Sequence, residues 1–125
     1  MSAITVLVTG AHAAAREAAI AARIVPGTAT ALLLEGLPDG IDRFAHAADW
    51  PQLRITRIAP GCFCCIGNLT MQVTLNRLLR QRPAYLFISM IATPHLVRVQ
   101  EWLRQPPYAT LLTLAETMHC DNHGR

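Results

Sequence analysis

Three cysteines, Cys62, Cys64 and Cys65, lie within four consecutive residues directly after Gly61. In extended backbone, Cys62 and Cys64 point to one side, and a turn after Cys65 brings the third sulfur toward the same centre. Three thiolates suit a soft metal such as Zn²⁺ or Cu⁺ and leave a fourth tetrahedral position open for transfer. The spacing therefore predicts a thiol metal site. The alternatives are small apolar side chains at a strand end and a disulfide or redox role.

The end of the sequence holds further metal-capable side chains at His119, Cys120 and His123. They are secondary candidates for completing the cysteine site or for forming a site of their own. A solvated polar tail over residues 119–125, poorly ordered unless something ties it down, is the alternative.

A second segment has the position of a phosphate-binding loop without its residues. In the pattern G-x-x-x-x-G-K-[ST], only the first glycine, Gly10, is present, and Ala15, Arg16 and Glu17 replace the last three residues of the pattern. The Glu17 carboxylate would repel phosphate, and the sequence contains no Lys. Gly10 and Arg16 are candidates for residual anion binding at a helix N-terminus. A strand-turn-helix corner with no ligand is the alternative, and GTP hydrolysis is not expected.

Short apolar runs alternate with helical patterns along the chain. This alternation predicts an α/β fold of three layers, with a mostly parallel sheet, helices on both faces and ligand sites at the carboxyl ends of strands. The expected strands cover residues 4–8, 31–34, 53–58, 85–91 and 110–115. The expected helices cover residues 12–23, 41–48, 68–82 and 94–105.

Composition limits the class of protein. With 125 residues, 52% of them hydrophobic, the chain is expected to form one domain over residues 1–118. The net charge is +3, but the basic residues do not form a cluster with aromatic partners. No nucleic-acid partner is therefore expected. No apolar run approaches the roughly 20 residues of a membrane helix. With no signal peptide and no secreted disulfide framework recognised, a cytoplasmic location without a membrane partner is expected.

The segment Gly61–Cys65, the helix after it and the strand beginning within Arg82–Ile88 resemble the corresponding parts of CobW-like P-loop GTPases. Leu34–Asp42 is similar to the family's Asn-Glu-Phe-Gly-x-x-Gly-Ile-Asp stretch, and Leu111–Glu116 is similar to its Val-Val-Thr-Val-Val-Asp strand. The resemblance spans nearly the whole sequence, and the cysteine motif is its most specific part. It implies a P-loop fold, GTP-dependent metal handling and zinc at the three cysteines. It also implies that Glu35 corresponds to an acidic residue that lies near the nucleotide and the metal in the family.

The sequence departs from the family in its nucleotide motifs. Ser89–Ala92 stands where the family has a Walker B region of the Glu-Thr-Thr-Gly type, and the guanine-reading Asn-Lys-x-Asp motif is not found. We therefore expect a non-hydrolysing, CobW-like pseudo-GTPase domain that binds zinc in metal homeostasis or delivery, with a client metalloprotein as partner. The alternatives are a protein-interaction or oligomerisation module with structural cysteines, and residual weak GTP binding. Loss of the family's C-terminal domain would expose apolar surface, which suggests a homodimer.

Overall fold

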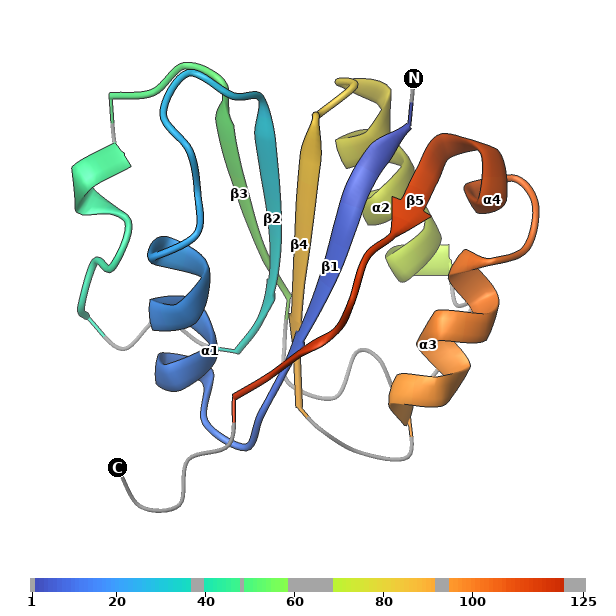
Figure 1. Cartoon of the computed structure of the whole chain (residues 1–125), viewed down its shortest axis with the longest axis horizontal. Coiled ribbons are helices and arrows are strands. Elements are labelled where there is room, and N and C mark those ends of the chain that lie inside the picture. Colours follow the sequence, from blue (N-terminus) through green and yellow to red (C-terminus); the bar gives the residue numbers. More distant parts are fainter. Residues whose placement is uncertain (1, 37–39, 48, 59–68, 92–94, 121–125) are drawn as a thin grey trace.

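The computed structural model describes residues 2–36, 40–47, 49–58, 69–91 and 95–120, and it has the predicted α/β fold (Figure 1). Its six-stranded sheet has the order β3-β2-β4-β1-β5, with β6 also paired to β1. The pairings are parallel. The strands are β1 (Ala3–Thr9), β2 (Thr30–Glu35), β3 (Leu53–Ile58), β4 (Tyr85–Met90), β5 (Leu112–Leu114) and β6 (Met118–His119). The helices are α1 (Ala13–Ala21), α2 (Leu69–Arg80), α3 (His95–Leu103) and α4 (Tyr108–Leu111).

The central strands are buried on both faces, as their apolar sequences predict. Every residue of β2 is buried, and so is β4 after Tyr85. Successive side chains of a strand point to opposite faces, so neighbouring residues belong to different cores. Leu33 packs in the core that includes α2 and α3, whereas Leu32 packs in the core that includes α1. The three layers of the prediction are thus confirmed, with α1 on one face and α2 and α3 on the other (Figure 1).

Two expected elements differ in the structure. The helix expected over residues 41–48 is reduced to a 3-10 turn, Ala45–Ala47, preceded by a bond from the Phe44 backbone N–H to Asp42 Oδ1 (3.1 Å). Asp42 satisfies the backbone locally, as aspartates in turns commonly do, and this competes with helix formation.

The strand expected over residues 110–115 begins as the helical turn α4, and β5 covers Leu112–Leu114 alone. Tyr108 explains the difference, because it is buried, donates its hydroxyl to Asn76 Oδ1 (3.0 Å) and packs edge-on against Trp102. These contacts with α2 and α3 hold the start of the segment away from the sheet.

The polar tail expected from residue 119 begins as a strand. Met118 and His119 of β6 pair in register with Val8 and Thr9 of β1. The pairing ties the chain down as far as Cys120, and His123 lies outside the described residues. None of the helices in the described ranges has the length and apolar character needed to cross a membrane.

Candidate functional site

The carboxyl ends of the central strands form the candidate site. Thr9 of β1 is in register with Met90 of β4, and Ser89 of β4 is in register with Leu34 of β2, so the three strands end together. Three residues, Gly10 to His12, connect β1 to α1, which begins at Ala13. Ala15 is therefore inside a helix, where a phosphate-binding loop would have its second glycine.

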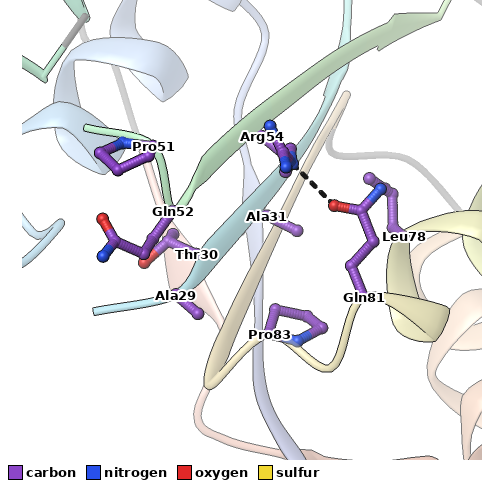
Figure 2. A pocket seen from close by; sticks show the side chains of 9 residues that line it. All are labelled: Ala29, Thr30, Ala31, Pro51, Gln52, Arg54, Leu78, Gln81 and Pro83. Atoms are coloured by element: carbon purple, nitrogen blue, oxygen red, sulfur yellow. Dashed lines mark hydrogen bonds between the residues drawn. The ribbon is translucent and has the colours of Figure 1, made fainter. Parts of the chain in front are cut away.

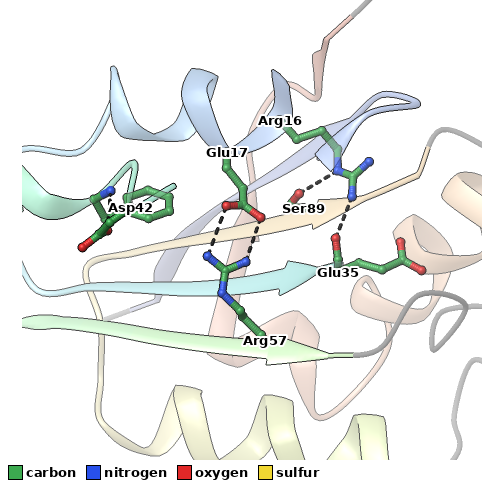
Figure 3. Close-up of polar contacts among 7 residues, drawn as sticks. Arg16, Glu17, Glu35, Asp42, Arg57 and Ser89 are labelled. Carbon is green, nitrogen blue, oxygen red and sulfur yellow. Dashed lines mark hydrogen bonds and ion pairs between the residues drawn. The ribbon is translucent and has the colours of Figure 1, made fainter. Parts of the chain in front are cut away.

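Arg16, in the first turns of α1, crosses this edge of the sheet. Its Nε donates a hydrogen bond to Ser89 Oγ (2.7 Å), and one terminal nitrogen donates to the Glu35 carbonyl (2.7 Å) (Figure 3). The other terminal nitrogen donates to the Gly10 carbonyl (2.6 Å). Arg16 is 1% exposed. The side chain therefore joins the loop after β1 to the ends of β2 and β4.

The site holds an internal positive charge. Burial lowers the pKa of Arg16 from its ordinary value, and the carboxylates of Glu35 and Glu17, followed by Cys120, act in the opposite direction. An arginine nevertheless stays protonated in proteins, because its pKa begins far above neutrality. Three hydrogen bonds to protein oxygens stabilise the buried cation.

Glu17, the next residue of α1, forms an ion pair with Arg57 of β3. The two guanidinium nitrogens of Arg57 lie 2.8 Å and 3.2 Å from the two carboxylate oxygens (Figure 3). The Glu17 side chain is 4% exposed and the Arg57 side chain 29% exposed. No motif in the sequence marks Arg57. The one available signal is Glu17, an acidic residue inside an Ala-rich helix, because a buried carboxylate needs a basic partner.

Cys120, the residue directly after β6, covers Gly10. The Cys120 backbone N–H donates to the Thr9 carbonyl (2.6 Å). A Cβ atom on residue 10 would collide with the Cys120 carbonyl oxygen and lie 3.1 Å from the Cys120 Cβ, so this close approach requires glycine. Burial raises the pKa of the Cys120 thiol, and the charge of Arg16 opposes that shift.

The other predicted site residues are distributed around this edge. Glu35 is buried, and its carboxylate accepts a hydrogen bond from the Ile91 backbone N–H (2.9 Å). His119 is exposed, with Nδ1 3.2 Å from Thr9 Oγ1. The structure thus brings Gly10, Arg16, Glu35 and Cys120 to one edge of the sheet.

The predicted thiol ligands Cys62, Cys64 and Cys65 lie outside the described residues, as does His123. Within the ranges that the structure describes, no group of three or more His, Cys, Asp or Glu side chains is arranged to hold a metal ion. The metal site therefore stays a prediction. β3 ends at Ile58, in register with Glu35 of β2, and the cysteine segment follows β3 in the sequence.

The sheet, its covering helices and the strand-turn-helix unit at its carboxyl edge are consistent with a P-loop NTPase-like α/β fold. Over 65 residues the chain is 37% identical to Zinc chaperone YeiR of Escherichia coli (strain K12). That match covers 51% of this chain and 20% of the relative, so the chain matches about a fifth of the relative's length. No protein-family model matches the chain. No significant match to a solved structure was found.

Proposed function

We propose that this chain is a CobW-like metal-handling domain that binds zinc, or a similar soft metal, through Cys62, Cys64 and Cys65 and does not hydrolyse GTP. The metal is the cargo, and a client metalloprotein receives it in metal homeostasis or delivery. The observation that carries the proposal is the 37% identity, over half of the chain, to a protein named a zinc chaperone. The three closely spaced cysteines supply a donor set that fits zinc, because thiolates are its preferred soft ligands.

The polar contacts of α1 support the non-hydrolysing part of the proposal. Arg16 stands at the position of the P-loop lysine, and its hydrogen bonds go to Ser89, Gly10 and Glu35 of its own chain. Glu17 stands at the position of the magnesium-binding hydroxyl and is engaged by Arg57. Both side chains therefore have protein partners in place of phosphate and magnesium.

The covering of Gly10 also supports it. In a phosphate-binding loop, backbone N–H groups need open space in front of them to accept phosphate oxygens. Here Cys120 lies against the first glycine of the pattern, held by its bond to the Thr9 carbonyl. A nucleotide at this place would have to displace Cys120.

Metal analysis of the full chain, purified under reducing conditions with a parallel thiol count, tests the zinc proposal. We expect about one zinc per chain, lost in the double variant Cys62→Ser/Cys64→Ser and retained in the control Cys120→Ser. Wild-type protein without zinc would overturn the proposal. Unchanged zinc content in the double variant would overturn the assignment to this motif. The ligands would then have to be sought among the secondary candidates Glu35, His119, Cys120 and His123.

Nucleotide binding is tested separately by thermal unfolding with GTP and magnesium and by phosphate release. We expect the transition temperature to stay the same, because the cation and carboxylate of α1 are already paired. A GTP-dependent rise together with phosphate release would contradict the non-hydrolysing assignment and leave the zinc result standing. Size-exclusion chromatography with light scattering of the same samples tests the proposed homodimer.

A further inference from the structure

A cavity of about 340 Å³ lies at the opposite edge of the sheet, where β2 and β3 begin and α2 ends (Figure 2). Its polar side chains include Arg54 and Gln52 from β3 and the turn before it, and Gln81 from the end of α2. Pro51, Pro83 and Leu78 contribute apolar walls. The volume is near the lower end of the range for small-molecule sites, about 300–1,000 Å³, so a small ligand fits it.

One hydrogen bond within the protein orients the Arg54 guanidinium through its Nε. Its Nε donates to Gln81 Oε1 (2.7 Å), as Figure 2 shows. In the part of the chain that the structure describes, the two terminal nitrogens of Arg54 donate no hydrogen bond. A guanidinium fixed through Nε presents these nitrogens as a planar pair of donors, which matches the two oxygens of a carboxylate.

The charges around the cavity favour an anion. Among the described residues that line it, Arg54 is the one charged side chain and none is Asp or Glu. The C-terminal end of α2 contributes a partial charge of about −0.5, which opposes anion binding. The full positive charge of Arg54 exceeds this partial charge in magnitude, so the charge at the cavity remains positive.

The walls distinguish an organic acid from a bare anion. Pro51 and Pro83 are rigid rings, and Leu78, Ala29 and Ala31 add aliphatic surface. Inorganic phosphate gains nothing from such surface, whereas an alkyl or aryl group does.

The backbone at the cavity is also held in a costly conformation. Arg82 has a φ of 54°, in the left-handed region that favours glycine. Its turn, closed by the Arg82 N–H to Leu79 carbonyl bond (3.0 Å), places Gln81 and Pro83 on either side of it, and both line the cavity. Strained backbone of this kind collects at binding sites.

We propose that this cavity binds a small organic carboxylate, with Arg54 pairing with the carboxylate and the proline and leucine walls holding its apolar part. The site lies where β2 and β3 begin, opposite to the carboxyl edge of the sheet that holds Arg16 and Glu35, and it does not depend on metal.

Titration of the isotopically labelled full chain by NMR, with benzoate, hexanoate and inorganic phosphate as probes, tests the proposal. We expect saturable shifts at Arg54 and Gln81 with one or both organic acids at millimolar concentrations, and weaker shifts with phosphate. Arg54→Gln should weaken binding of the organic acid about tenfold or more, because a charge-assisted pair of hydrogen bonds is lost. The control Arg80→Gln removes the same charge from the exposed end of α2 and should change binding less than about twofold.

Two outcomes would overturn the inference. Linear, non-saturating shifts with both organic acids would show that the cavity is no binding site. Equal binding of phosphate and the organic acids, or equal weakening by Arg54→Gln and Arg80→Gln, would show a general attraction to anions in place of the proposed site.

Discussion

The Nε of Arg16 donates a hydrogen bond of 2.7 Å to the hydroxyl of Ser89, and both side chains are buried. In the resemblance to CobW-like GTPases, these are the positions of the phosphate-binding lysine and the Walker B acid. The two side chains contact each other in the structure. The pairing joins the first turns of α1 to the end of β4 at the carboxyl edge of the sheet.

Arg16→Ala is expected to lower the free energy of unfolding by about 3 kcal/mol or more, because three acceptors lose a charged donor and a cavity remains. Arg16→Lys keeps the charge but cannot reach all three acceptors, and we expect a smaller loss of about 1–2 kcal/mol. Urea unfolding followed by circular dichroism measures both. An Arg16→Ala protein with the wild-type midpoint would show that these hydrogen bonds contribute nothing net.

The Glu17–Arg57 pair should show a measurable coupling energy. A double-mutant cycle with Glu17→Gln and Arg57→Gln is expected to give about 1–2 kcal/mol, because Glu17 is almost fully buried while Arg57 is partly screened by solvent. Unfolding experiments at low and high salt measure the coupling, which should persist at high salt. A coupling near zero, as exposed pairs commonly show, would contradict this expectation.

Arg82→Gly is expected to raise the free energy of unfolding by about 0.5–1 kcal/mol. Glycine adopts the left-handed conformation of residue 82 without steric cost, and this gain exceeds its larger entropy loss on folding. Arg77→Gly, in α2, is the matched control and should lower the free energy of unfolding by about 1 kcal/mol. Destabilisation by both substitutions would argue against a left-handed residue 82.

Cys120 should react slowly with iodoacetamide in the folded protein, because burial raises its pKa and only the thiolate reacts. The reaction midpoint should lie at higher pH in the native protein than in urea. Trypsin cleavage after Arg104 places Cys120 in the peptide 105–125, apart from Cys62, Cys64 and Cys65, so mass spectrometry can follow it alone.

The raised pKa of Cys120 also determines how the stability of the protein depends on pH. A raised native pKa gives stability that is complete below the unfolded pKa and is lost as pH rises toward the native pKa. Wild-type protein should therefore lose stability above the ordinary thiol pKa relative to Cys120→Ser. Equal pH profiles for the two proteins, or native alkylation as fast as in urea, would contradict the burial of this thiol.

Much of the fold followed from local patterns. The strand expected over residues 53–58 is β3 as observed, because an apolar run between turn residues has few other ways to bury itself. The helix expected over residues 41–48 was wrong, since a short apolar pattern does not outweigh an aspartate that satisfies the backbone nearby. The strand expected over residues 110–115 was shortened by the contacts of Tyr108 with α2 and α3, which no local pattern reports.

The sequence by itself determined the alternating α/β architecture, whereas the chemistry of the cysteine motif stays a prediction. It also determined that no lysine is present to serve a phosphate. Only the tertiary structure decided where Arg16 and Glu17 point, because all their side-chain partners except Gly10 come from strands 19 to 73 residues away. Periodicity encodes which face of an element is buried, whereas the partners of a buried charge depend on which strands meet at that edge.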